Sequence, residues 1–248
     1  MKEWITGRNP VYETLRAGRR QVFRLWVAQG VQEKGRILDI LQLAKARRAS
    51  IENVPRARVD GLGESPQGVA LEASGYPYAD LKEILERAGE RGEPPFVLIL
   101  DALQNPQNLG TLLRTAEAVG VHGVILPLRH AVLVTPAVVN ASSGASEHML
   151  VAQENLAQAI RTLKAEGVWV AGLEGEGGED PRKLRLDGAL ALVVGNEGEG
   201  MRQLVRESCD FLVRLPMQGK VESLNAAVAG SVALYLAYLA RGGKPGGS

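Results

Sequence analysis

The chain has 248 residues, of which 45% are apolar and 23% are charged, and this balance excludes a wholly disordered protein. The formal net charge of +1 is unevenly divided, because residues 1–73 carry 13 Lys and Arg against 8 Asp and Glu, whereas residues 95–248 carry 13 against 15. The single cysteine, Cys209, excludes an intrachain disulfide and favours a reducing, cytoplasmic location.

The first third of the chain alternates between short helical and strand patterns. Helices are expected from Asn9 to Leu15 and from Gly35 to Arg48 because apolar residues recur there at helical spacing. Short strands are expected at 23–28, 51–54 and 69–72. We therefore predict a small α/β domain over residues 1–74.

A linker follows this domain. It contains a polar helix over 79–90 and ends in the Pro- and Gly-containing stretch 91–95, so we place it at residues 75–94.

Residues 95–248 are predicted to form an α/β domain with a mostly parallel sheet. Continuous apolar runs rich in Val, Ile and Leu are typical of strands buried on both faces of a parallel sheet. Such runs, each followed by a helical segment, occur at 96–100, 123–126, 168–173, 189–194 and 211–215. The last helix begins near Leu224, and its apolar stretch 226–240 is shorter than the roughly 20 residues that span a bilayer, so no membrane partner is expected.

Three loops at the carboxyl ends of these strands carry the residues of chemical interest, because ligands of open α/β sheets gather at that edge. The first runs from Asp101 through Asn108 and Gly110 to Arg114, and the second is the glycine-rich turn 195–201. The third runs from Leu215-Pro216-Met217 to Ser223-Leu224-Asn225.

Several other site types have no support in the sequence. No strand is followed by GxGxxG, and Gly219-Lys220 lacks the spacing of a P-loop. The histidines His122, His130 and His148 stand apart from carboxylates and thiols at metal-ligand spacing, so no metal site is predicted.

Together and in this order, the three loops resemble the motifs of the SpoU/TrmH family of RNA 2′-O-ribose methyltransferases, which belong to the SPOUT class. The first motif is Asn108, Gly110 and Arg114, and the second is the Asn-Glu-x-x-Gly turn at Asn196, Glu197 and Gly200. The third is the run from Leu215 to Asn225, and residues 142–147 look like the family's Ser-x-Gly-Ala segment. Residues 7–15 look like the start of the family's L30e-type RNA-binding domain.

This resemblance implies a fold, a cofactor and partners. It implies a SPOUT α/β-knot domain over residues 95–248, with a deep trefoil knot, and an L30e-like substrate-binding domain over residues 1–74. It implies S-adenosylmethionine as cofactor, a homodimer, and RNA rather than DNA as partner. The reaction it implies is methylation of a guanosine 2′-hydroxyl in the peptidyl-transferase region of 23S rRNA.

The resemblance also implies roles for individual residues. The catalytic group would comprise Arg114, Asn108, Glu197, Ser223 and Asn225. We expect Arg114 to stabilise the 2′-oxygen as a charged donor rather than to act as a base, because guanidinium groups stay protonated in proteins. The residues expected to contact the cofactor are Gly195, Leu215, Leu224, Asn196, Met217, Leu173 and Gly175.

RNA docking is assigned to cations of the first domain. Phosphate contacts are expected from Arg16, Arg19, Arg20, Arg24, Lys45, Arg47 and Arg48. An alternative interpretation of the same excess of cations is ordinary solvated surface charge. Aromatic residues make up only 4% of the chain, which favours recognition of RNA shape over base stacking.

Two alternatives stay open. One is a tRNA methyltransferase of the same family, and the other is a noncatalytic RNA-binding or ribosome-assembly protein. The second would be expected to lack some of Asn108, Arg114, Glu197 and Asn225, all of which are present.

Overall fold

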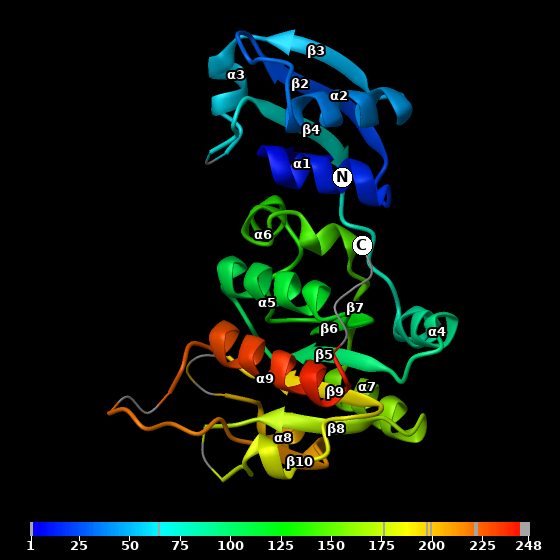
Figure 1. The fold of residues 1–248 in the computed structure, drawn as a ribbon, viewed down its shortest axis with the longest axis vertical. Helices are drawn as coiled ribbons and strands as arrows, with labels where there is room; N and C mark the ends of the chain where they lie inside the picture. The colour runs from blue at the N-terminus through cyan, green and yellow to red at the C-terminus, as the bar shows by residue number, and fades with distance from the viewer. Residues whose placement is uncertain are drawn as a thin grey trace. The chain divides into compact units, whose positions relative to one another are not determined.

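The computed structural model describes residues 2–63, 65–175, 177–196, 198, 200–220 and 223–243. The chain divides into two compact units, which are considered separately below (Figure 1). Unit 1 comprises Met1–Pro77 together with Leu133–His148, and unit 2 comprises Tyr78–Val132 together with Met149–Ser248. The backbone therefore passes between the two units three times.

Unit 1 is built around a four-stranded sheet with the order β1-β4-β2-β3. Strand β4 is antiparallel to β1 and to β2, whereas β3 is parallel to β2. Its strands and helices are β1 (Lys2–Thr6), α1 (Arg8–Ala17), β2 (Val22–Ala28), α2 (Arg36–Ala46), β3 (Ser50–Val54), α3 (Arg56–Asp60), β4 (Val69–Ser74), α6 (Pro136–Ala141) and the 3₁₀ helix η1 (Ala145–His148).

Unit 2 contains a six-stranded sheet with the order β10-β8-β9-β5-β6-β7. All of its strand pairs are parallel, as predicted. Its elements are α4 (Leu81–Arg91), β5 (Phe96–Leu100), α5 (Pro106–Ala118), β6 (Gly123–Pro127), β7 (Val151–Glu154), α7 (Leu156–Ala165), β8 (Trp169–Leu173), the 3₁₀ helix η2 (Pro181–Lys183), β9 (Leu190–Val194), α8 (Gln203–Ser208), β10 (Phe211–Val213) and α9 (Ala226–Ala240).

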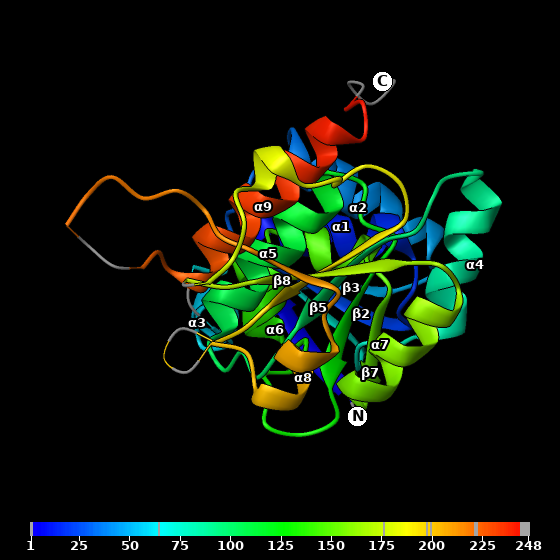
Figure 2. The same cartoon turned by 90° about the horizontal axis from the view of Figure 1, so that it is seen from below.

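Helices cover both faces of this sheet. Successive side chains of a strand point to opposite faces, and Val97 and Ile99 of β5 pack in one apolar cluster with side chains of α4, α7 and α8. Helices α5 and α9 pack against each other on the other side of the strands, as Figure 2 shows. Their close approach depends on Gly230 of α9, where an added Cβ would lie 2.7 Å from a Leu112 methyl of α5.

The compact units differ from the predicted domain boundaries in two places. The predicted linker 75–94 contains α4, which begins at a capping box formed by Asp80 and Glu83 and buries Leu81 and Ile84 against the unit 2 sheet. Residues 133–148, which the sequence analysis includes in the methyltransferase domain, pack with unit 1. Across the described ranges, no helix is long and apolar enough to cross a membrane.

The fold class is the predicted one, a mostly parallel α/β domain combined with a small α/β domain. The knot implied by the resemblance stays a prediction.

Candidate active site

A cavity in unit 2 lies where three neighbouring parallel strands end. Strands β10, β8 and β9 are adjacent, so the loops that follow them meet at one edge of the sheet. The start of α9 completes the wall. The described residues that line the cavity are Leu173, Glu174, Gly175, Val194, Gly195, Asn196, Gly198, Gly200, Leu215, Met217, Ser223, Leu224, Ala226 and Ala229.

The glycine-rich turn after β9 forms one wall, and its shape requires a glycine at Gly195. The backbone N–H of Asn196 donates to the carbonyl of Gly200 over 3.1 Å, which folds the turn back on itself. The Asn196 side chain accepts from the N–H of Gly198 over 2.9 Å. A Cβ at Gly195 would lie 2.2 Å from the carbonyl carbon of Gly200. The turn therefore leaves no room for a side chain at position 195.

All seven residues that the sequence analysis assigns to the cofactor line this one cavity. Of the predicted catalytic residues, Ser223 also lines it, whereas Glu197 lies outside the described residues. The structure thus brings together the second and third sequence motifs, although they are separated along the chain.

The third motif is joined to the first by a hydrogen bond of Asn225. Its neighbours Leu224 and Ala226 line the cavity, while its own Oδ1 caps α9 by accepting from the N–H of Ala227 over 2.9 Å. Its Nδ2 donates to Oδ1 of Asn108 on α5 over 3.3 Å. Arg114 lies six residues further along α5 and is exposed.

Two carboxylates near the site were given no role by the sequence reasoning. Glu174 directly follows β8, lines the cavity, and forms an ion pair of 3.0 Å with Arg206 of α8. Asp101 directly follows β5, is fully buried, and accepts from the backbone N–H and from Nε of Arg202 over 2.8 and 2.7 Å. Asp101 therefore fixes the chain just after the glycine-rich turn. Their position at strand ends was the signal that could have found them.

The cavity fits S-adenosylmethionine. Its walls offer apolar side chains such as Leu173, Leu215 and Met217 beside exposed backbone, which suits an adenine ring and its polar edge. No described lining residue is a Lys or Arg, and the charged one is Glu174, which matches a ligand that carries a sulfonium and an ammonium group. Among the residues that the structure describes, no three His, Cys, Asp or Glu side chains are grouped so as to hold a metal ion.

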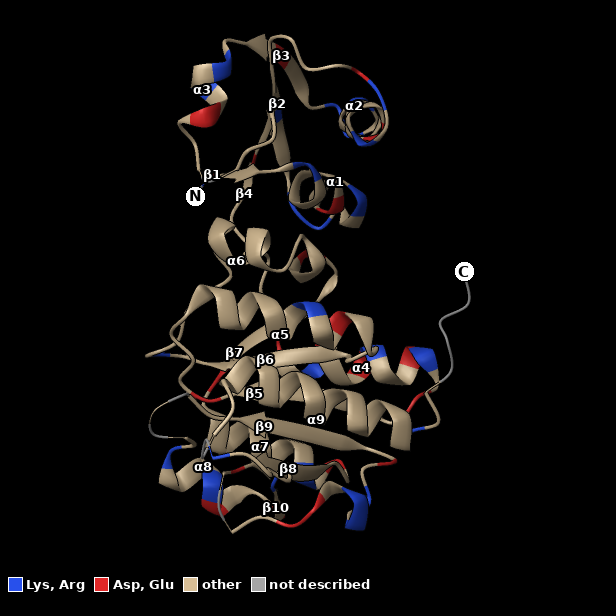
Figure 3. Cartoon of the chain, turned by 60° about the vertical axis from the view of Figure 1, so that its left-hand side comes forward, with Lys and Arg blue, Asp and Glu red and all other residues tan. Residues whose placement is uncertain are grey.

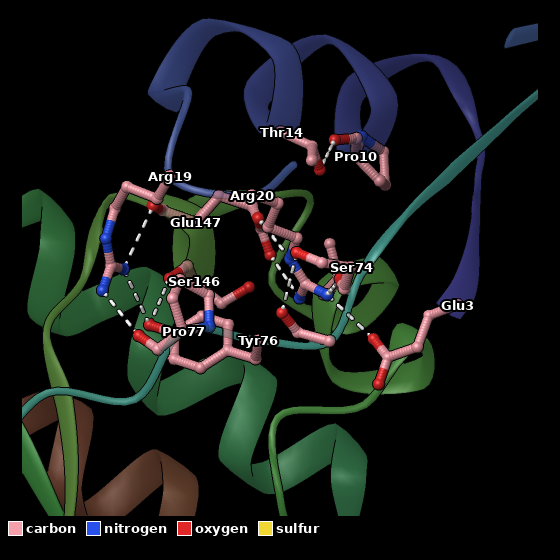
Figure 4. A network of polar contacts seen from close by, with 12 residues as sticks. Glu3, Pro10, Thr14, Arg19, Arg20, Ser74, Tyr76, Pro77, Ser146 and Glu147 are labelled. Carbon is pink, nitrogen blue, oxygen red and sulfur yellow. Dashed lines mark hydrogen bonds and ion pairs between the residues drawn. The ribbon is translucent and has the colours of Figure 1, made fainter. Parts of the chain in front are cut away.

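In unit 1 the structure corrects part of the predicted RNA contact set. The Arg20 side chain is fully buried and forms a two-pronged ion pair with Glu147, with Nε–Oε2 and Nη2–Oε1 distances of 2.8 and 2.9 Å (Figure 4). Arg19 donates to the hydroxyl of Tyr76 and to the carbonyl of Pro77. The prediction that Arg20 contacts RNA is therefore wrong, because its charge is used inside the unit.

Arg24 is also engaged, since its Nε lies 2.7 Å from a carboxylate oxygen of Glu72. The remaining cations of the predicted set, Arg16, Lys45, Arg47 and Arg48, are exposed.

Comparisons with known proteins match both units. The sequence profile described as the SpoU rRNA Methylase family matches residues 95–235, and that described as RNA 2′-O ribose methyltransferase substrate binding matches residues 4–79. The protein YacO of Bacillus subtilis (strain 168), named as a TrmH family tRNA/rRNA methyltransferase, is 44% identical over 96% of both chains.

Solved structures agree with these matches. The SpoU methyltransferase AviRb from Streptomyces viridochromogenes, crystallised with AdoMet, has a TM-score of 0.82 at 25% identity, covering 97% of this chain and 90% of its own. An AdoMet-bound rRNA methyltransferase from Sinorhizobium meliloti has the same fold, with a TM-score of 0.77 at 24% identity, covering 95% and 86%. The chain therefore belongs to the SpoU/TrmH family of S-adenosylmethionine-dependent RNA 2′-O-methyltransferases.

Proposed function

We propose that the chain methylates the 2′-hydroxyl of a guanosine in the peptidyl-transferase region of 23S rRNA, in the cytoplasm. Two profile matches support the choice of a large RNA. A separate substrate-binding segment is matched over residues 4–79, and the profile that matches the methyltransferase segment is described as that of rRNA methylases. Its excess of cations suits a large polyanion. The guanosine and its region follow from the resemblance of the motifs.

Two sets of residues hold the proposed reactants. The cavity residues Gly195, Asn196, Leu215, Met217 and Leu224, together with Leu173 and Gly175, would hold S-adenosylmethionine. When bound, this cofactor supplies a methyl group on a sulfonium, which an oxygen nucleophile can accept directly. The task left to the protein is to align the ribose oxygen and to stabilise the charge that develops on it.

Arg114 is the proposed catalytic residue. It is exposed on α5, the helix whose first turn is tied to the cavity rim through the Asn108–Asn225 hydrogen bond. A guanidinium beside the 2′-oxygen stabilises the negative charge that develops on this oxygen as its proton leaves, and it can hold a neighbouring phosphate oxygen at the same time. We propose that the proton of the 2′-hydroxyl passes to that phosphate, to Glu197 or to water, because a guanidinium does not accept it.

The remaining proposed catalytic residues orient these groups. Asn225 keeps α5 and α9 in register through its contact with Asn108. Ser223 offers a hydroxyl at the wall of the cavity, two residues before Asn225. Such supporting side chains keep a reacting constellation within its productive geometry.

The catalytic proposal is tested with Arg114→Ala and Arg114→Lys in single-turnover methylation assays. Removing one donor of this kind costs roughly 10²- to 10³-fold in rate, and the affinity for S-adenosylmethionine should stay unchanged by calorimetry. Arg161→Ala is the matched control, because Arg161 is an exposed arginine on α7, on the other side of the sheet. Normal turnover by Arg114→Ala would refute the assignment.

The substrate proposal is tested by mapping ribose methylation across rRNA and tRNA in the source organism after deletion of the gene. Loss of one methyl group in the peptidyl-transferase region, restored by the wild-type gene but not by the Arg114→Ala gene, is the expected result. Loss of a tRNA methyl group instead would establish the alternative that the name of the Bacillus subtilis relative also allows.

We also propose a homodimer that forms through α9. This 15-residue helix contains no charged residue. Its exposed side chains include Val228, Val232, Tyr235 and Leu239, which are three or four positions apart and therefore share one face of the helix. A continuous apolar stripe of this kind is typical of an interface. Val232→Asp combined with Leu239→Asp should give a monomer in sedimentation at micromolar concentration, and a wild-type protein that is already monomeric would refute the proposal.

A further inference from the structure

A hollow in unit 1 lies at the end of the sheet where three strands finish. Because β1 and β2 are both antiparallel to β4, and β3 is parallel to β2, the carboxyl ends of β1, β2 and β3 share one edge. The segments that follow these strands form the hollow together with Gln67, which lies just before β4. It has a volume of about 600 Å³ and is lined by Arg8, Gly30, Val31, Gln32, Lys34, Arg56 and Gln67.

The lining of the hollow is cationic. It contains three cations and no described Asp or Glu, and the three come from three separate segments, after β1, before α2 and at the start of α3. The Lys and Arg positions of these segments are blue in Figure 3. Converging like charges repel one another, so an arrangement of this kind is favourable when an anion lies between them.

The three cations have no close acidic partner among the described residues. The backbone N–H and Nε of Arg8 donate to Oε1 and to the carbonyl of Gln67 over 3.0 and 3.3 Å, and both acceptors are uncharged. The ion pair of Arg56 with Asp60 is long, at 3.6 Å, and exposed on both sides. Within the described ranges, Lys34 has no acidic partner within 4.0 Å.

We propose that this hollow binds the phosphodiester backbone of the substrate RNA, with Arg8, Lys34 and Arg56 as its phosphate contacts. The proposal rests on the proposed function, in that it takes RNA to be the substrate. Gln32, Gln67 and the backbone at Gly30 add uncharged groups for ribose and phosphate oxygens. No described aromatic side chain lines the hollow, so it positions the RNA and does not read its bases.

The opposite edge of the same sheet carries a second group of cations, which the sequence analysis had assigned to RNA. Lys45, Arg47 and Arg48 lie at the C-terminal end of α2, just before β3 begins. Cations at a helix C-terminus interact favourably with the helix dipole, and Arg47 Nη1 also donates to the carbonyl of Gly18 over 3.4 Å. The end of one helix therefore explains why Lys45, Arg47 and Arg48 lie together, whereas Arg8, Lys34 and Arg56 converge from three separate segments.

These two groups allow a matched comparison, because each contains two arginines and one lysine. The hollow variant is Arg8→Gln, Lys34→Gln and Arg56→Gln in one chain, and the control variant is Lys45→Gln, Arg47→Gln and Arg48→Gln. Both are made in the full-length protein. Circular dichroism and the fluorescence of Trp4 and Trp26 verify that unit 1 is folded in each.

The measurement is RNA affinity against salt concentration, with an unmodified transcript of the peptidyl-transferase region of 23S rRNA and with bulk tRNA as probes. Each phosphate contact contributes about −0.7 to −0.9 to the slope of log K against log salt. The hollow variant should therefore lose on the order of a hundredfold in affinity near 0.1 M salt, and its slope should become shallower by about 2 to 3. The control variant should stay within about threefold of the wild type.

The proposal is overturned if the hollow variant binds both RNAs as the wild type does, or if the two variants lose the same affinity. Methyl transfer is followed separately on the same samples. Absence of methyl transfer to either probe by the wild-type protein would count against the proposed substrates, while the affinity comparison would still decide the role of the hollow. In this assay the hollow variant should need a higher RNA concentration for half-maximal methylation, because the hollow binds substrate.

Discussion

Removing the buried guanidinium of Arg20 should strongly destabilise unit 1. The Arg20 side chain has no exposed surface, and it donates to Glu147, to Glu3 over 2.8 Å, and to the carbonyl of Ser74 over 2.9 Å. Glu147 is 1% exposed, so Arg20→Met would leave its carboxylate buried opposite an apolar side chain. Loss of one partner of a buried ion pair costs about 3–5 kcal/mol.

Two further variants isolate the contribution of the pair. Replacing both partners, as in Arg20→Met with Glu147→Leu, removes the stranded charge and should recover about 2 kcal/mol relative to Arg20→Met alone. Arg24→Met is the matched control, because Arg24 is 39% exposed and pairs with Glu72 over 2.7 Å. The Glu72 carboxylate is 9% exposed, but it keeps Lys2 at 3.8 Å as a second cation when Arg24 is removed. We therefore expect this variant to lose about 1 kcal/mol, as for partly exposed ion pairs.

The assay is urea unfolding followed by tryptophan fluorescence in a Trp169→Phe background. The chain has three tryptophans, and only Trp169 lies in unit 2, where it is 60% exposed. The remaining signal comes from Trp4 and Trp26, whose rings are 4.2 Å apart in unit 1. An Arg20→Met protein that unfolds within 1 kcal/mol of the Arg24→Met protein would refute this reasoning, as would a double variant no more stable than the single one.

Three further predictions concern unit 2. Gly195→Ala should weaken the binding of S-adenosylmethionine at least about tenfold in calorimetry, because its Cβ cannot be placed without moving the backbone at Gly200. Asn225→Ala should lower the stability of unit 2 by about 1 kcal/mol through loss of the α9 cap, measured as a lower melting temperature. Burial, and secondarily the nearby Arg91, lower the pKa of His122 below its ordinary value of 6.5, although the contact with Glu93 opposes this shift. Below about pH 6.5 the folded state then binds fewer protons than the unfolded state, so the free energy of unfolding should fall as the pH falls below that value. His122→Asn should remove this pH dependence. A wild-type free energy of unfolding that does not change with pH would contradict this prediction.

The central strands of unit 2 could be predicted from the sequence because their burial on both faces leaves uninterrupted apolar runs. Strands β5 and β9 are examples, with all five residues of each buried. The edge strand β7 and the strand β1 escaped notice, since they are four and five residues long and include polar positions. A short strand that is buried on one face only alternates apolar with polar residues, so its sequence pattern is weaker than an uninterrupted apolar run.

The cavity could be predicted because its residues follow strand ends in recognisable motifs, whereas the long-range polar contacts could not. Nothing near Arg20 in the sequence distinguishes it from Arg16 or Arg47, which are exposed. Its partner Glu147 lies 127 residues away. Which cation faces RNA and which is buried is therefore decided by tertiary packing, and charge counts along the chain do not contain that information.

The three passages of the backbone between the units also bear on how the protein is made. A protein emerges from the ribosome N-terminus first, and domains generally fold as units as they emerge. Unit 1 contains the first 77 residues, but it also contains Leu133–His148, including the carboxylate that neutralises Arg20. Its folding can be completed only after residue 148 has been synthesised, when β5 and β6 of unit 2 have already appeared. The order of synthesis thus couples maturation of the substrate-binding unit to that of the catalytic sheet. A fragment that ends near residue 77 would lack Glu147, one of the two carboxylates that pair with Arg20.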